Sequence, residues 1–330
     1  MERWFDLNGA NLRVQSEDGP LLQPMLHYLE GMAAEPATSA DFTLTLERSG
    51  TPPDAPPEAD LFYEGMLPEG LIGRFYLLDD VRWITIPGEI SLVVDKPSRE
   101  ARIIVRRGRE ALVSGTAAIH AIAAALAECR QHLIHGAAIR LPAEDKAFLL
   151  LAPSGVGKTT SALALALDGF GLLTDDAAVL DVDRLASGER PRIWGLPRPL
   201  KVHQRTAAML PRVGSVLGDK WDSAGEQPLM RDALRTIVEV PDVKPFPLAA
   251  IVILSSRVQG DHVIRPMKRS EILVRTATDN VFRGPREVLA GDVQRFQAIS
   301  SAIAIADGYE LNVGSNLHTL GSTVASALAA

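Results

Sequence analysis

The chain has 330 residues, of which 46% are hydrophobic and 23% are charged. This is the composition of an ordinary globular protein, and the length suggests about two domains. With 34 Lys and Arg against 41 Asp and Glu, the formal charge is −7 and the pI is near 5.6. This balance excludes the basic footprint of a protein that binds nucleic acid non-specifically, so we expect no nucleic-acid partner.

Cysteine usage and the N-terminal sequence both favour an intracellular protein. Cys129 is the single cysteine, so no disulfide can form within the chain. The first residues lack a basic region followed by an apolar core, unlike a signal peptide. No apolar run approaches the ~20 residues needed to span a bilayer. We therefore expect a cytoplasmic protein with no membrane partner.

Short alternating runs separated by turn residues predict a β-rich region over residues 1–112. The candidate strands share this alternation and lie at 42–47, 73–78, 81–86, 90–94 and 102–105. A proline-rich stretch at 50–59 predicts an exposed loop, and the pattern at 21–32 suggests one early helix. No motif in this region carries recognisable chemistry.

A second domain is expected over residues 113–330. Apolar residues at helical spacing predict a connecting helix over 116–132. Two apolar runs follow, at 136–141 and 147–151, and the polar turn between them predicts a hairpin. A standard doubly wound domain begins at its phosphate-loop strand, so an antiparallel strand ahead of such a loop indicates a different architecture.

The rest of this domain is less regular in sequence. Residues 194–201, WGLPRPLK, hold too many prolines for a regular element, and 211–232 read as a mobile surface excursion. A buried strand is predicted at 249–255 and a helix over 286–305.

The most informative stretch is FLLLAPSGVGKTT, residues 148–160, in which an apolar strand leads through a glycine-rich turn into a helix. This is the order of a phosphate-binding loop, whose backbone N–H groups and helix N-terminus bind phosphate oxygens. Lys158 would reach the β- and γ-phosphates, and the Thr159 hydroxyl would ligate Mg²⁺. The predicted nucleotide-binding residues are Pro153, Ser154, Gly155, Val156, Gly157, Lys158, Thr159 and Thr160.

The first position of the loop motif departs from the strict pattern. Ala152 stands where G-x-x-x-x-G-K-[ST] has glycine, which is tolerated if this residue still belongs to the strand and avoids positive φ. A chance match in a chain rich in Gly and Ala is the alternative. The strand and helix signals on either side favour the phosphate loop, so we predict a bound nucleoside triphosphate.

Two adjacent carboxylates, Asp175 and Asp176, follow the loop after one predicted helix and one predicted strand. One could hold Mg²⁺ and the other could accept a proton from a substrate hydroxyl. Successive strand residues face opposite sides, so both can serve one site only if the strand ends or bends there. The alternative is a turn followed by a solvent-exposed acid.

Three further residues are weaker candidates. His135 begins the first strand of the hairpin, and the sequence does not show whether that end lies near the phosphate loop. Arg198 and Lys201 could stabilise charge on the transferred phosphoryl group or hold an acidic substrate. For all three, a structural or solvated role is the competing interpretation.

Taken in order, IHGAAI, APSGVGKTT, GFGLLTDD and GLPRPLK resemble the corresponding motifs of the HPr kinase/phosphorylase-related group. That group has the phosphoenolpyruvate carboxykinase-like fold. The resemblance implies an α/β fold of the α+β type, with a mixed sheet that carries the phosphate loop, beside the β-rich N-terminal region. It covers about residues 133–201, and the β-rich region is loosely similar to kinase-like proteins of peptide-modification (lasso-type) clusters.

The resemblance also implies roles for single residues. Lys158 matches the phosphate-binding lysine, and Thr159 matches the Mg²⁺ ligand. Asp175 matches the acid/base carboxylate, Asp176 matches the carboxylate close to the metal, and His135 matches a histidine near the phosphates. The later glycine-rich signature that true HPr kinases use with their protein substrate is absent, so HPr is not implied as the acceptor.

These features together predict a Mg²⁺- and ATP-dependent kinase that phosphorylates a hydroxyl, of Ser or Thr, on a peptide or small protein. A small-molecule kinase with the same site remains an alternative, because nothing in the sequence limits the size of the acceptor. A nucleotide-binding regulatory module without turnover is another, although the Asp pair argues against it. Members of the group often form oligomers, so a homo-oligomer is an open alternative to a monomer.

Overall fold

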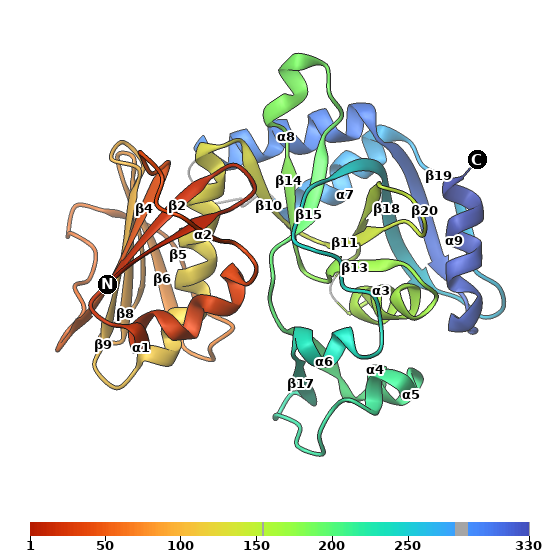
Figure 1. Cartoon of the computed structure of the whole chain (residues 1–330), viewed down its shortest axis with the longest axis horizontal. Helices are drawn as coiled ribbons and strands as arrows, with labels where there is room; N and C mark the ends of the chain where they lie inside the picture. Colours follow the sequence, from red (N-terminus) through yellow and green to blue (C-terminus); the bar gives the residue numbers. More distant parts are fainter. Residues whose placement is uncertain (154, 281–289, 330) are drawn as a thin grey trace. The chain divides into compact units, whose positions relative to one another are not determined.

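The computed structural model describes residues 1–153, 155–280 and 290–329 (Figure 1). Contacts divide the chain into two compact units, the first of which is Met1–Gln131, while the second begins at His132. Each unit contains its own large sheet, and helices accompany both, so the chain is a mixed α/β protein of the α+β type. The boundary predicted between residues 112 and 113 precedes the structural one, because the helix that follows it packs on strands of the first unit.

The first unit is β-rich, as the sequence predicts, and its sheet contains strands that the alternation did not reveal. Neighbouring strands are ordered β3-β1-β2-β4-β9-β8-β7-β6-β5. Only the β2–β4 and β4–β9 pairs are parallel. The strands are β1 (Glu2–Asp6), β2 (Asn11–Ser16), β3 (Ala33–Ala34), β4 (Phe42–Ser49), β5 (Asp60–Met66), β6 (Ile72–Leu78), β7 (Val81–Ile86), β8 (Ile90–Asp95) and β9 (Glu100–Arg106).

The early helix predicted at 21–32 is wrong as a single element. The segment instead forms a short α1 (Gly19–Leu22) and a 3₁₀ helix (Gln23–Leu29). Each begins with a proline near its N-terminus, where the missing N–H is tolerated, and Pro24 cannot continue an α-helical hydrogen-bond ladder. The proline-rich loop predicted at 50–59 contains no helix or strand.

The helix α2 (Thr116–Glu128) contacts β8, β4 and β9 through buried alanine, isoleucine and leucine side chains. It ends before the predicted residue 132, because Arg130 adopts a φ of 55° and Gln131 starts the next strand. Within the described residues, the stretch Glu110–Glu128, which adds a 3₁₀ turn (Glu110–Ser114), is long and apolar enough to cross a membrane by length and composition alone. Its packing on the sheet is that of a core helix.

The second unit is built on a mixed sheet with the order β10-β14-β15-β18-β12-β11-β13, to which β20 and β19 are added beside β18. The predicted hairpin is present as β11 and β12, and the predicted buried strand is the centre of β18. The strands are β10 (Gln131–His135), β11 (Ala137–Arg140), β12 (Ala147–Leu151), β13 (Gly171–Thr174), β14 (Ala177–Asp181), β15 (Arg192–Gly195), β18 (Phe246–Arg257), β19 (Val263–Pro266) and β20 (Asp307–Val313).

The directions of these strands bring several chain segments to one edge of the sheet. β12 runs parallel to β18 and antiparallel to β11, and β13 is antiparallel to β11. The C-terminal ends of β12, β13 and β18 therefore meet the N-terminal end of β11 at the same edge. Ala137, the first residue of β11, lies opposite Leu150 near the end of β12.

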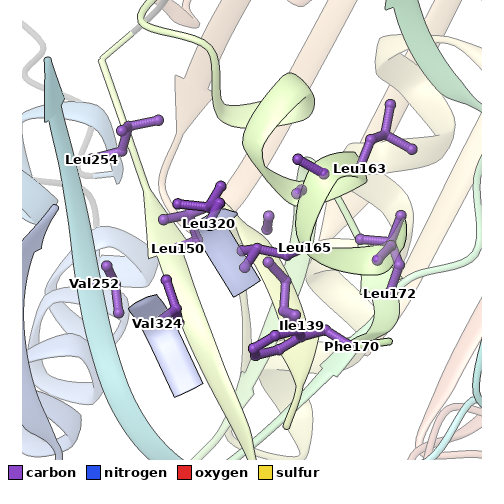
Figure 2. Close-up of a cluster of buried hydrophobic side chains, with 14 of the residues drawn as sticks. Ile139, Leu150, Leu163, Leu165, Phe170, Leu172, Val252, Leu254, Leu320 and Val324 are labelled. Atoms are coloured by element: carbon purple, nitrogen blue, oxygen red, sulfur yellow. The ribbon is translucent and has the colours of Figure 1, made fainter. Parts of the chain in front are cut away.

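Helices cover both faces of this sheet (Figure 1). Alternate residues of β12 enter different cores: Leu150 packs with α3 (Lys158–Leu167) and α9 (Leu320–Leu328), whereas Leu149 packs with α7 (Arg269–Asn280) and α8 (Ala290–Ile305). Figure 2 shows the first of these cores, where leucines of α3 lie against strand and α9 side chains. For the helix predicted over 286–305, α8 confirms 290–305, and 286–289 lie outside the described residues.

The segment between β15 and β18 is more ordered than predicted. It contains a two-stranded sheet of β16 (Leu200–His203) and β17 (Glu226–Leu229) with α4 (Gln204–Met209), α5 (Pro211–Gly214) and α6 (Arg231–Arg235). The prediction that 194–201 contain no regular element is wrong, because β15 extends to Gly195 and β16 begins at Leu200. The prediction of a surface excursion over 211–232 is also wrong, because Val213 and Leu229 are buried in the main core.

Candidate functional site

The phosphate loop connects the end of β12 to α3, in the predicted order. Gly155 and Gly157 have φ values of 80° and 110°, in the left-handed region that favours glycine. A Cβ on Gly157 would lie 2.7 Å from Arg257 Nη2. Ala152 is buried in the core and is not among the described residues with positive φ, so alanine fits the position where the strict motif has glycine. The predicted loop residue Ser154 lies outside the described residues.

Lys158 begins α3 and points to the Asp pair. Its Nζ donates to the backbone oxygen of Asp175 at 2.6 Å and forms an ion pair with Asp176 Oδ1 at 2.8 Å. The two aspartates fall between β13, which ends at Thr174, and β14, which starts at Ala177. The strand ends there, so both side chains can serve one site.

Asp175 is turned inward, with only 3% of its surface exposed, and accepts a hydrogen bond of 2.9 Å from the Thr159 hydroxyl. Burial, followed by the negative charge of the neighbouring Asp176, raises the pKa of Asp175 above its ordinary value. A cation bound beside Thr159 would reverse this effect, because it would favour the ionised carboxylate.

Asp176 faces the pocket and is surrounded by positive charge. Besides Lys158, it pairs with His135 Nδ1 at 3.2 Å and with Arg198 Nη1 at 3.2 Å. Burial acts to raise the pKa of Asp176, but these three neighbours outweigh it and hold the pKa below its ordinary value. The adjacent carboxylates are therefore driven in opposite directions by their surroundings.

His135 lies at the phosphate-loop end of the sheet, which the sequence could not show. The prediction that it begins the hairpin strand is wrong, because His135 ends β10 and the hairpin strand β11 starts at Ala137. Its backbone N–H donates to Asn280 Oδ1 of α7 at 2.6 Å. The next residue, Gly136, has no room for a side chain, because a Cβ would lie 2.7 Å from a methyl group of Leu151. The Gly136 N–H donates to the Asp176 carbonyl and Gly136 bridges to Ala177, which brings the His135 ring to Asp176.

The two weaker candidates differ in position. Arg198 reaches Asp176 and belongs to the charged centre. Lys201 lines the same pocket, but it makes no ion pair with a described residue. Its neighbours on β16, Leu200 and Val202, are buried, and the alternation of the strand directs Lys201 outward.

These residues surround one pocket of about 930 Å³, entirely within the second unit. The volume is near the upper end of the ~300–1,000 Å³ typical of small-ligand sites. Sequence reasoning missed several lining residues: His203, Arg205, Thr206, Met209, Glu226 and Arg257. Only Arg257 had a usable signal, since it ends a buried strand parallel to the phosphate-loop strand, where ligands commonly bind.

The donors present suit Mg²⁺ held partly by a nucleotide. No group of three or more His, Cys, Asp or Glu is arranged to hold a metal among the residues with described coordinates. Mg²⁺ does not require such a cage, because it binds one or two protein oxygens together with phosphate oxygens and water. The Thr159 hydroxyl and the Asp175 carboxylate, in contact at the helix start, provide oxygens of this kind.

Comparisons with known proteins do not add to this geometry. No protein-family model matches the chain, and a search of curated proteins found no match.

Proposed function

We propose that this protein is a Mg²⁺- and ATP-dependent kinase that transfers the γ-phosphoryl group to a hydroxyl of an acceptor. The observation that carries this proposal is the ion pair between Lys158 of the phosphate loop and Asp176, which unites a triphosphate-binding lysine and a carboxylate in one pocket. A nucleotide-binding module without turnover would need the lysine, but it would not need a carboxylate exposed in the part of the pocket where an acceptor hydroxyl binds.

The environments of the two aspartates support separate roles. Asp175, bonded to Thr159, suits the metal side, as in other phosphate-loop enzymes where Mg²⁺ lies between the loop hydroxyl and an aspartate. Both aspartates line the pocket, but the Asp176 side chain is 32% exposed there, so it suits the general base that accepts the proton of the acceptor hydroxyl. This division is the reverse of the one implied by the resemblance to HPr kinases.

Binding of a triphosphate would activate this base. In the structure, Lys158 neutralises Asp176. When the lysine turns to the β- and γ-phosphates, Asp176 loses a stabilising charge and its proton affinity rises. Arg198 and the loop amides would then stabilise charge on the phosphoryl oxygens, and Mg²⁺ would neutralise charge that develops on the leaving group.

The proposal extends to the fold family, the acceptor and the location. The antiparallel β11 ahead of the phosphate-loop strand and the Asp pair after β13 support a fold of the HPr-kinase, phosphoenolpyruvate carboxykinase-like kind. The acceptor would be a Ser or Thr of a peptide or small protein in the cytoplasm. The small-molecule and non-catalytic alternatives are separated from it by the next experiment.

The test is to incubate the whole chain with Mg²⁺, γ-labelled ATP and a cell lysate. We expect label on a peptide or protein, formed only with active chain. Label on a small metabolite would show that the protein is a small-molecule kinase instead. ATP binding without any transfer or hydrolysis would contradict the kinase proposal and leave a binding module.

Substitution of each aspartate tests the division of roles. Asp176→Asn should lower transfer by roughly 10²- to 10⁴-fold, the usual contribution of a general base, with nucleotide binding retained. Asp175→Asn should raise the Mg²⁺ concentration needed for half-maximal binding of ATP. If Asp175→Asn instead removes transfer at saturating Mg²⁺ while Asp176→Asn does not, the roles are those of the resemblance.

A further inference from the structure

One wall of the pocket comes from a chain segment that lies after the phosphate loop and the Asp pair, and this wall is basic. It is formed by β16, α4 and β17, and it includes Lys201, His203, Arg205 and Glu226. Lys201 and Arg205 are both exposed, since the buried residues of this segment, Val202 and Thr206, alternate with them. We call Lys201, His203, Arg205, Thr206, Ala208, Met209 and Glu226 the basic wall.

The cations of this wall have no carboxylate partners. Neither Lys201 nor Arg205 forms an ion pair with a described residue, whereas Lys158 and Arg198 both pair with Asp176. Among the described residues, the acidic residue that lines this wall is Glu226, which lies opposite His203 in the β16–β17 ladder. Positive charge thus gathers here although the whole chain carries a formal charge of −7. An anion that enters the pocket would be attracted by these charges.

Groups other than Lys201 and Arg205 are available to bind the phosphates of the nucleotide. Arg257, which forms no ion pair with the residues the structure describes, lies beside the phosphate loop, with Nη2 2.7 Å from where a Cβ of Gly157 would stand. Its Nη1 donates to the Met209 sulfur at 3.4 Å, a weak acceptor. Arg257, Lys158 and the loop amides therefore suit the phosphates, which leaves Lys201 and Arg205 for the acceptor.

The exposure of the wall favours a chain segment as the acceptor. Small-molecule sites bury about 70–90% of the ligand surface. Here Lys201 and Arg205 are exposed, and Met209 at the end of α4 is 41% exposed. An open basic surface of this kind matches the side chains of an extended acidic peptide, whose carboxylates can pair with exposed cations while one residue enters the pocket.

We propose that the acceptor is an acidic peptide segment, in which Asp or Glu residues flank the phosphorylated Ser or Thr and pair with Lys201 and Arg205. This inference rests on the proposed kinase function for the reaction, but it makes a claim about binding that can be tested without transfer.

The experiment measures binding of two labelled peptides to the whole chain with Mg²⁺ and ADP. One peptide has a single Ser flanked by Asp and Glu, and the other has the matching Asn and Gln. We expect the acidic peptide to bind about tenfold more tightly, or about 1.4 kcal/mol, since two exposed ion pairs contribute at this level. The difference should shrink as salt is raised. Equal affinities at low salt would overturn the proposal.

Variants locate the effect. The double substitution Lys201→Gln, Arg205→Gln should remove the preference and leave the affinity for Mg²⁺·ADP unchanged, while Lys201→Arg with Arg205→Lys should keep it. Lys220→Gln, an exposed lysine of the same segment outside the pocket, is the matched control. If the double variant keeps the preference for the acidic peptide, or loses affinity for Mg²⁺·ADP, Lys201 and Arg205 do not serve as the peptide-binding cations and the proposal is overturned.

The result of the peptide-binding experiment can be distinguished from the result of the test for kinase activity. If the lysate experiment shows no transfer but the acidic preference depends on Lys201 and Arg205, the pocket binds acidic peptides without phosphorylating them. If transfer occurs, mapping the labelled Ser or Thr should show acidic neighbours. Labelled sites with neutral or basic neighbours would overturn the inference and leave the kinase standing.

Discussion

The basic wall differs from the opposite side of the pocket in how its charges are balanced. We call Pro153, Gly155, Gly157, Lys158, Thr159, Asp175, Asp176 and His135 the phosphate wall. There, each charged or polar group has a partner: Lys158 and His135 contact Asp176, and Thr159 contacts Asp175. In the basic wall, Lys201 and Arg205 have none among the described residues. A paired network holds geometry for chemistry, whereas unpaired exposed cations are free to meet a second, charged partner.

The largest effect on phosphoryl transfer is expected at Lys158, in the phosphate wall. Lys158→Met should lower phosphoryl transfer by roughly 10²- to 10³-fold, the cost of removing one positioned group that stabilises transition-state charge. The measurement is single-turnover transfer from γ-labelled ATP, compared with Lys220→Gln. Transfer that falls by less than tenfold would mean that the phosphate wall does not carry the chemistry.

Gly157 tests the contact between the phosphate loop and Arg257. Gly157→Ala should lower the free energy of unfolding by about 1–2 kcal/mol, measured by thermal denaturation, since the left-handed conformation costs a residue with Cβ that much and the methyl group meets the guanidinium.

Gly155→Ala is the matched control for that substitution. Gly155 also has positive φ, but nothing lies within 4 Å of its Cβ position, so only the backbone strain applies. Arg257→Gln should therefore reduce the effect of Gly157→Ala and leave that of Gly155→Ala unchanged. Equal effects of Arg257→Gln on both would contradict the contact.

Proton release on binding should distinguish Asp175 from all residues of the basic wall. The pKa of Asp175 is raised in the free protein, so part of its population is protonated above the ordinary Asp pKa of 3.8. A metal ion beside Thr159 favours the ionised form, so binding of Mg²⁺·ATP expels a proton and becomes stronger with rising pH. The change is at most tenfold per pH unit and ends above the raised pKa.

Calorimetry in buffers of different ionisation enthalpy measures this release. Asp175→Asn should abolish it, while Lys201→Gln should leave it intact. Release that persists in Asp175→Asn would place the titrating group elsewhere.

An effect on stability is also expected where the two walls are joined. The Thr160 and Thr206 hydroxyls share a buried hydrogen bond of 2.8 Å between α3 and α4. Thr206→Val leaves the Thr160 hydroxyl without this partner, which should lower the free energy of unfolding by about 1–3 kcal/mol. Thermal denaturation checks this, and Thr160→Val with Thr206→Val should be closer to the parent, because both polar groups are then gone. A double variant less stable than Thr206→Val would contradict the pairing.

Much of the fold was predictable where local pattern and burial agree. Alternation predicted five strands of the first sheet, and the β11–β12 hairpin followed from two apolar runs around a polar turn. The errors lie where local signals compete with tertiary packing. Prolines in WGLPRPLK suggested irregular chain, yet Leu200 and Val202 enter the core and draw β16 into a ladder with β17. Pro24 had the opposite effect and divided a predicted helix.

The site was predictable in the same uneven way. Lys158, Thr159 and the Asp pair are close in sequence, so their spacing around one strand and one helix carried the prediction. Arg257 lies far from the loop in sequence, and the parallel pairing of β18 with β12 brings it to the phosphate loop, while α7 brings Asn280 to His135. Nothing in the spacing of Arg205 or Glu226 indicated a pocket, because their placement depends on the β16–β17 register.

The sequence by itself determined the phosphate loop, its strand and helix, and the presence of two carboxylates after it, since these depend on local conformation and short spacing. Tertiary structure alone decided which carboxylate is buried against Thr159 and which is more exposed among the cations, because burial and neighbouring charge exist only once the sheet has formed. It also decided that His135 lies at the phosphate end, because the pairing of the chain at Gly136 with Asp176 and Ala177 is set by packing between strands.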